Sequence, residues 1–167
     1  MPISYRMKDR GHTPAGKAAT DLILETFRCN GRLLSAGDKL VAKLGLTSAR
    51  WQVLGAIALS PAAEPVARLA RNMGLHRQGV QRIVNELEKE GLVAFRPNPH
   101  HRKAHLVVLT GRGRTIYEEA ERVQIPWVNA LSEGIAAEDI ERALRVLRSL
   151  RLRLEEKGRP EPETDGG

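Results

Sequence analysis

The feature that most constrains the fold is a change in hydrophobic period within residues 65–110. As far as Gly91, apolar residues recur at the spacing of amphipathic helices, and beyond it they alternate as in β-strands. The pattern predicts helices over 65–72 and from His76 to Gly91, then strands over 92–96 and 104–110. Gly74 falls in the turn between the two helices, where a left-handed C-cap is expected. This order predicts a helix-turn-helix followed by a hairpin wing.

The second of these helices has two faces of different chemistry. Its apolar stripe consists of Val80, Ile83, Val84 and Leu87. The opposite face carries side chains suited to reading base edges, namely Arg77, Gln78, Gln81, Arg82 and Asn85, with Lys89 farther along. Arginine suits guanine, and glutamine or asparagine suits adenine, in the major groove. We expect the acids Glu86, Glu88 and Glu90 to lie in the C-terminal half, away from that contact.

The predicted hairpin ends in a stiff, basic tip. Pro97 and Pro99 restrict the loop, and the residues that follow are His100, His101, Arg102 and Lys103. A protruding basic loop suits DNA phosphates or a narrow minor groove, where the negative potential is concentrated. We therefore assign His101, Arg102 and Lys103 to the DNA-binding surface, although an ordinary solvated turn has the same composition.

Helical patterns flank this central stretch on both sides. A long helix is predicted over 18–44, another from Thr47 or Ser48 to Ser60–Pro61, one from Thr110 that Pro126 should kink, and a last one over 138–157. The fold class is therefore mainly α with a small β-hairpin wing. We divide the chain into a disordered tail (1–15), a dimerisation helix (16–46), a winged helix-turn-helix domain (47–113), dimerisation helices (114–157) and a second disordered tail (158–167).

Composition narrows the functional classes. The 167-residue chain has 27 Lys and Arg against 20 Asp and Glu, a formal charge of +7 that favours polyanionic partners. No apolar run reaches the roughly 18 residues of a membrane span, and the N-terminus lacks the apolar core of a secretory signal. We expect a cytoplasmic protein that does not bind membranes. Because enzyme motifs are absent, we expect no catalytic residue, no cofactor and no enzymatic activity.

Two minor alternatives concern thiol and metal chemistry. Cys29 is the only cysteine, which excludes an internal disulfide; a buried structural role is favoured over peroxide sensing because no resolving cysteine is present. His100, His101 and His105 lack the cysteine or carboxylate company of a metal site. We therefore expect no bound metal.

The central residues resemble the multiple antibiotic resistance regulator (MarR) family. The resemblance is carried by Leu69-Ala70, Gln81-Arg82-Ile83-Val84, Leu87 to Val93, Arg102, and Leu109-Thr110 with Gly113, and it extends over roughly residues 18–157. It implies recognition-helix contacts by Arg77, Gln78, Gln81 and Arg82, a wing arginine at Arg102, and a phosphate contact near Ser48. Three positions depart from the family pattern: His101 replaces the usual wing acid, His76 is a poorer cap, and Gly79 replaces a side chain.

The family resemblance also implies assembly and regulation. It implies a two-fold dimer held by the first, fifth and sixth helices, which agrees with apolar stripes too long for one small domain to cover. It places an effector pocket between the dimer helices and the DNA-binding lobe, where Phe27, Trp51 and Tyr117 are candidate ligand-binding residues for an aromatic or phenolic molecule. Trp51 is equally well explained as core.

These observations favour a sequence-specific, double-stranded DNA-binding regulator. We expect a homodimeric repressor that binds a pseudo-palindromic operator and is released by a small ligand. The alternative is a winged-helix protein-interaction module that does not bind DNA, and the basic wing argues against it.

Overall fold

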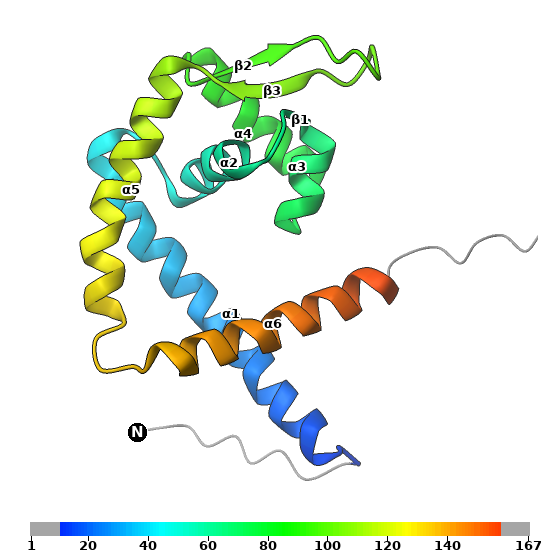
Figure 1. Ribbon diagram of the computed structural model, residues 1–167, viewed down its shortest axis with the longest axis vertical. Coiled ribbons are helices and arrows are strands. Elements are labelled where there is room, and N and C mark those ends of the chain that lie inside the picture. The colour runs from blue at the N-terminus through cyan, green and yellow to red at the C-terminus, as the bar shows by residue number, and fades with distance from the viewer. Residues whose placement is uncertain (1–10, 158–167) are drawn as a thin grey trace, which may run out of the picture. The chain divides into compact units, whose positions relative to one another are not determined.

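The computed structural model describes residues 11–157, which form two compact units that meet within helix α5 (Figure 1). The first unit ends at Ile125 and the second begins at Pro126. The elements are α1 (Pro14–Val41), the 3₁₀ helix η1 (Ala42–Leu44), α2 (Ser48–Leu59), β1 (Glu64–Pro65), α3 (Val66–Met73), α4 (Arg77–Lys89), β2 (Val93–Arg96), β3 (Leu106–Leu109), α5 (Gly111–Leu131) and α6 (Ala137–Lys157). This is the predicted class, mainly helical with a small sheet.

Helix α1 begins at Pro14, earlier than the predicted start at residue 18. The Thr13 hydroxyl oxygen accepts a hydrogen bond from the Gly16 amide at 3.0 Å, and Pro14 occupies the first helical turn, where its missing N–H costs nothing. The predicted tail over 1–15 is therefore too long by these helical residues. Residues 1–10 and the predicted tail over 158–167 lie outside the described part of the chain.

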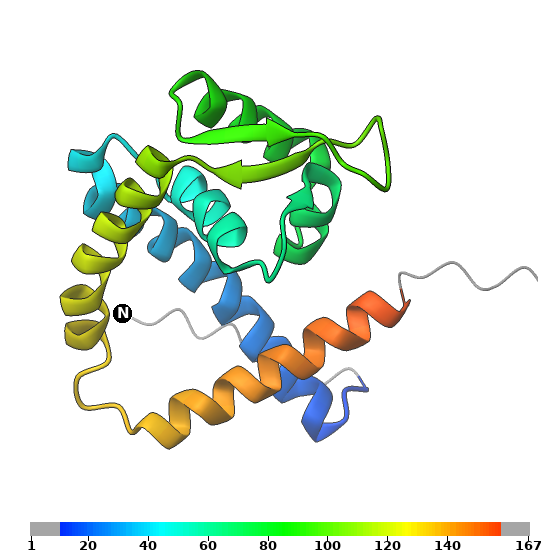
Figure 2. The same cartoon turned by 45° about the horizontal axis from the view of Figure 1, so that its top comes forward.

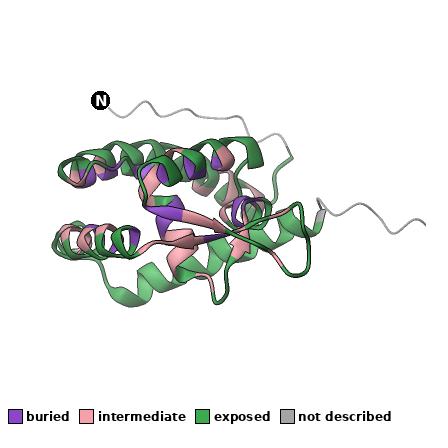
Figure 3. Ribbon diagram, turned by 90° about the horizontal axis from the view of Figure 1, so that it is seen from above, coloured by how far each residue is buried: buried purple, intermediate pink, exposed green. Residues whose placement is uncertain are grey.

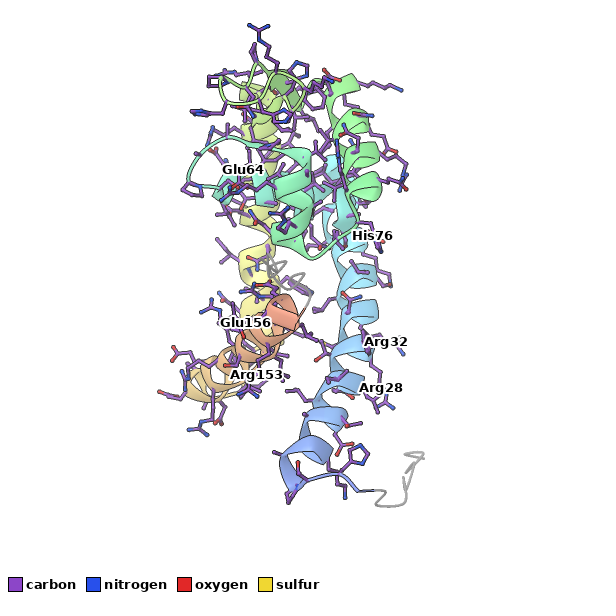
Figure 4. All side chains as sticks on the ribbon, turned by 90° about the vertical axis from the view of Figure 1, so that its right-hand side faces the viewer. Arg28, Arg32, Glu64, His76, Arg153 and Glu156 are labelled. Atoms are coloured by element: carbon purple, nitrogen blue, oxygen red, sulfur yellow. The ribbon has the colours of Figure 1, made fainter. Side chains whose placement is uncertain are left out.

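The helix-turn-helix is formed by α3 and α4, close to the predicted bounds. Gly74 adopts a left-handed conformation (φ 66°) that closes α3. His76, labelled in Figure 4, is the N-cap residue of α4. Its side chain makes no capping hydrogen bond, so it is the poorer cap that the sequence predicts. Ahead of them, α2 begins after Thr47, whose hydroxyl oxygen accepts a hydrogen bond from the Arg50 amide at 3.3 Å.

The sheet has three antiparallel strands in the order β1-β3-β2. The hairpin of β2 and β3 was predicted, and it pairs Val93 with Leu109 and Arg96 with Leu106. The two-residue strand β1 differs from the sequence pattern, which places Pro65 at the start of a helix; α3 begins one residue later, at Val66. Figure 2 shows the hairpin lying alongside α2 and α3, with its loop extending past α3.

One hydrophobic core lies beneath this sheet. Its fully buried side chains come from every element of the first unit except the 3₁₀ helix and β1, and the largest are Leu54, Leu69, Leu87, Val41, Val53, Val80, Val84, Val93 and Val107. The predicted apolar stripe of α4 is buried throughout. The face of α4 opposite that stripe is therefore the one presented to solvent.

The start of α5 belongs to the first unit, so the winged-helix core extends beyond the predicted domain end at 113. Tyr117 and Ala120 are buried in this core. Thr110 fixes the junction: its hydroxyl donates to the Gly91 carbonyl at 2.7 Å and accepts from the Gly113 amide at 3.0 Å. A Cβ atom on Gly113 would overlap the Leu92 carbonyl oxygen, so only glycine fits this approach of two backbones.

The second unit is built differently. It contains the end of α5 and α6, and residues 137–156 of α6 are exposed except for the half-buried Leu150, as the green helix in Figure 3 shows. Several of its exposed side chains are large and apolar: Ile140, Leu144, Val146, Leu147, Leu152 and Leu154. Within residues 11–157, no helix is long and apolar enough to cross a membrane.

Candidate nucleic-acid interface

The outward face of α4 gathers the residues predicted to read bases. Arg77, Gln78, Arg82 and Asn85 are exposed, while Gln81 is partly covered. These five side chains line one shallow depression together with Glu86 and Lys89. Because the buried stripe of α4 anchors the helix in the core, these side chains project from a rigid support.

A second groove joins this face to the wing. Arg77, Gln81 and Asn85 form its α4 side. The other walls are formed by residues of β1, the start of α3, β2 and the wing, namely Pro65, Val66, Ala67, Phe95, His101, Lys103, Ala104 and His105. The structure thus brings two of the predicted wing residues, His101 and Lys103, to the same groove as three predicted α4 residues. Arg102 is exposed on the loop between them.

The wing tip is organised by Asn98, a residue outside the predicted DNA-binding set. Its side-chain amide donates to the Ala104 carbonyl at 2.9 Å, and its side-chain oxygen accepts from the His100 amide at 3.0 Å. The loop is closed further by backbone hydrogen bonds from His101 to Asn98 and from Ala104 to His101. Asparagine between two prolines is a turn signal that could have revealed this role. The Asn98 side chain thus holds the loop in a wing where His101 replaces the usual acid before Arg102.

The acids of α4 do not all lie away from the predicted contact face. Glu86 lines the depression with Arg82 and accepts a hydrogen bond from its Nη1 at 3.1 Å. Glu90 instead pairs with Arg50 of α2. The expectation that every acid of this helix avoids the reading face is therefore wrong for Glu86, because the i, i+4 spacing places it beside Arg82.

Arg50 and Arg112 fix the C-terminal end of α4. Arg50, whose side chain is 15% exposed, donates from Nη1 to the Gly45 carbonyl at 3.0 Å as well as pairing with Glu90. Arg112 at the start of α5 donates to the Glu90 carbonyl at 2.9 Å. This cluster connects α4 to three other segments, namely α2, the loop at Gly45 and α5, and no periodic signal in the sequence indicates it.

Ser48 does not fit the predicted phosphate contact. It is 3% exposed, its hydroxyl donates to the Leu34 carbonyl at 2.6 Å, and its amide donates to Asp38 Oδ1 at 2.7 Å. Gly37 faces it so closely that a Cβ there would overlap the Ser48 hydroxyl. Ser48 therefore joins α1 to α2 inside the protein, and its polar groups are already used.

The three candidate ligand-binding residues do not come together within the subunit. Trp51 approaches Gly37 on α1, and Tyr117 approaches Gly55, one turn along α2 from Trp51. Phe27 is 70% exposed and lies ten residues before Gly37 on the same helix, about 15 Å away. Burial, then the hydrogen bond to Glu121 and its charge, raise the pKa of Tyr117 from 10.0 to about 12. Tyr117 is thus a neutral core side chain with its hydroxyl already donated.

The structure also places the side chains that were considered for thiol and metal chemistry, Cys29 and the histidines of the wing. Cys29 is exposed on α1, so the expectation that it is buried is wrong for the isolated chain. Among residues 11–157, the histidines of the wing belong to no group of three side chains placed to hold a metal ion.

Known proteins with similar sequences and structures agree with this architecture. A family model described as MarR family matches residues 44–104. An uncharacterised protein of Mycobacterium tuberculosis is 38% identical over 114 residues, which cover 68% of this chain and 78% of that protein. The transcriptional activatory protein BadR of Rhodopseudomonas palustris is 32% identical over 102 residues, or 60% of this chain and 58% of BadR.

Solved structures extend the likeness to about four fifths of the chain. CouR of Rhodococcus jostii, bound to p-coumaroyl-CoA, matches with a TM-score of 0.70 and 25% identity over 79% of this chain and 92% of CouR. The structure of the repressor CouR on a 23-mer DNA duplex matches with a TM-score of 0.69 and 22% identity over 84% and 99% of the two chains. The chain belongs to the MarR family of winged helix-turn-helix transcriptional regulators.

Proposed function

We propose that this regulator reads a pseudo-palindromic operator as a homodimer, represses transcription there, and has no catalytic activity of its own. The reading residues are those of the outer face of α4, namely Arg77, Gln78, Gln81, Arg82 and Asn85. The observation that carries the proposal is the division of α4 between a buried apolar stripe and an exposed face rich in arginine and amides. A helix of this kind fits the major groove, where these side chain types match the edges of guanine and adenine.

In this proposal the wing contacts the DNA backbone and the adjacent minor groove. Arg102 and Lys103 are exposed on a loop that Asn98 holds closed, and His101 and Lys103 line the groove shared with α4. A positive loop beside a recognition helix gains affinity from phosphate charge whatever the sequence. Arg102 is assigned to the minor groove.

The assembly is proposed from apolar side chains that no other part of the described chain covers. On α1 these are Ile23, Leu24, Phe27, Leu33 and Leu34, and on α6 they include Ile140, Leu144 and Leu147 at helical spacing. Arg28 and Arg32 project from successive turns of α1 (Figure 4). A stable dimer buries about 800 Å² on each subunit, which two long amphipathic helices can supply. The two copies of α4 would then read half-sites about one helical turn apart.

Release by a small aromatic or phenolic ligand is the regulatory part of the proposal. CouR, which has the same fold, is a repressor that binds p-coumaroyl-CoA and DNA. Aromatic acids and their coenzyme A thioesters are therefore the first compounds to titrate into the DNA complex, with tryptophan fluorescence and DNA release as readouts. Release by one chemical class supports the proposal, and retention of DNA with every class contradicts it.

The reading role is tested by selecting a preferred duplex from a random pool and measuring affinity by fluorescence anisotropy at several salt concentrations. Arg82→Ala should weaken binding to the selected duplex by about 1–3 kcal/mol and relax preference at one base pair. Arg102→Ala should weaken selected and random duplexes alike and reduce the salt slope by about 1. Arg145→Ala on α6 removes the same charge elsewhere and serves as the control.

Other results would contradict the proposed reading role of α4 or DNA binding as a whole. If the protein selects no sequence, or if Arg82→Ala and Arg145→Ala bind the selected duplex equally well, α4 does not read bases. If random duplex shows no salt-dependent binding at all, the protein-interaction alternative replaces the proposal.

A further inference from the structure

The reading face of α4 contains one carboxylate, which is unexpected on a surface that meets phosphates. Glu86 is half-buried and lines the depression formed by the predicted reading residues, whereas Glu88 is exposed and does not line it. The Glu86 side chain accepts a hydrogen bond from Arg82 Nη1 at 3.1 Å, and both side chains retain contact with solvent. A negative charge at this position opposes association with any DNA. The presence of Glu86 on this face is therefore explained only if the carboxylate has a further role that offsets this cost.

The pairing is repeated one residue earlier on the same helix. Gln81 Nε2 donates to Asn85 Oδ1 at 2.9 Å, so both central reading residues have a polar partner one turn toward the C-terminus. Such a partner restricts the rotamers of a long side chain before it meets DNA. A guanidinium has five N–H donors in a fixed plane, and the bond to Glu86 uses only Nη1. The rest of the fork remains available for the two acceptors of guanine.

We propose that Glu86 is a positioning residue that makes Arg82 select guanine rather than phosphate, an inference that rests on the proposed reading role of α4. Two effects act together. The carboxylate repels phosphates, so it weakens binding of Arg82 and of the whole face to random duplex. It also holds the guanidinium beside Glu86 on the outer face of α4, and Arg82 has to break the ion pair before it can turn to a phosphate. At the correct base pair Arg82 keeps Glu86 and gains guanine, so the penalty falls mainly on wrong sequences.

A purely structural role for the same ion pair predicts a different result. An exposed i, i+4 pair stabilises a helix by only about 0.3–0.5 kcal/mol, and losing it would alter folding stability without changing base preference. The discriminating quantity is therefore the specificity ratio, defined as the affinity for the selected duplex divided by the affinity for a random duplex of equal length at the same salt.

The experiment compares Glu86→Gln with Glu88→Gln, which removes the same charge from the same helix outside the depression. Glu86→Gln should tighten random binding more than selected binding and lower the specificity ratio at least about 5-fold, the lower limit of discrimination by one bidentate arginine–guanine contact. Glu88→Gln should tighten both by the same factor and leave the ratio unchanged. Thermal denaturation of both variants verifies that each is folded.

The action through Arg82 is tested by adding Glu86→Gln to Arg82→Ala in a double-mutant cycle. If Glu86 works through Arg82, the second change leaves the specificity ratio of Arg82→Ala unaltered. The inference is overturned if Glu86→Gln and Glu88→Gln change the specificity ratio equally, or if Glu86→Gln still lowers that ratio when Arg82 is already replaced by alanine. A wild-type protein that prefers no duplex would instead refute the proposed function itself, and that outcome is visible before any variant is made.

Discussion

The winged-helix unit and helix α6 use apolar residues in opposite ways. In the first unit the apolar stripe of α4 is buried by α2, α3 and the sheet, and glycines such as Gly113 permit close backbone approach. In α6 a comparable stripe of Ile140, Leu144 and Leu147 remains exposed. The apolar residues of α4 and of α6 recur with the same helical period. The period alone therefore does not tell which of the two stripes is buried within the chain. The contrast teaches that the winged-helix core is complete in one subunit, whereas the exposed stripe of α6, like the exposed apolar side chains of α1, is the surface on which the proposed dimer depends.

The largest effect is expected from Gly113→Ala in the first unit. The added Cβ would meet the Leu92 carbonyl oxygen, which is backbone and unable to move aside like a side chain. We expect the free energy of unfolding to fall by more than about 4 kcal/mol, measured by urea denaturation. Gly79→Ala, with no atom near the new Cβ, is the matched control and should gain about 1 kcal/mol in helix propensity. Equal stabilities for the two variants would show that the unit is loosely packed.

The next effect tests the other side of the comparison. Leu144→Glu combined with Leu147→Glu should convert a dimer to monomers, because two buried leucines together contribute about 3 kcal/mol or more to association, equivalent to at least about 100-fold in the dissociation constant. Sedimentation equilibrium measures this change. Arg142→Glu, on the opposite face of the same helix, should leave the dimer intact. A wild-type chain that sediments as a monomer would remove the reason for the exposed stripe.

A smaller effect is expected from Ser48→Ala at the contact between α1 and α2. The Leu34 carbonyl would lose its partner in a buried place, at a cost of about 1–2 kcal/mol in the free energy of unfolding. The salt dependence of DNA binding should stay the same, because the Ser48 hydroxyl is used internally. A salt slope reduced by about 1 would instead support the phosphate contact near Ser48 that the family resemblance implies.

The sequence predicts those features that depend on neighbouring residues. Gly74, Thr110 and the bounds of α2, α3 and α4 follow from capping residues and hydrophobic period, and the structure confirms them. The inward direction of Ser48 depends instead on Gly37, which belongs to another helix, and Arg50 meets Glu90 from forty residues away. No local pattern encodes such contacts.

The candidate reading face shows the same division. Exposure of Arg77, Gln78 and Arg82 follows directly from the position of the apolar stripe. The pairing of Arg82 with Glu86 follows from their i, i+4 spacing, and a position in the C-terminal half of α4 does not by itself keep an acid off the outer face. The separation of Phe27 from Trp51 could not be predicted from the sequence, because it depends on which part of α1 packs against α2.

The claim that α4 enters the major groove in two copies is tested most directly by cleavage from the helix itself. A Cys29→Ser chain with Gln78→Cys has a single cysteine on the outer face of α4, to which an iron chelate can be attached. On the selected duplex, hydroxyl radicals should cut in two symmetric clusters whose centres lie about 10 base pairs apart. Bound duplex that is cut at one cluster only, or not at all, would contradict the account.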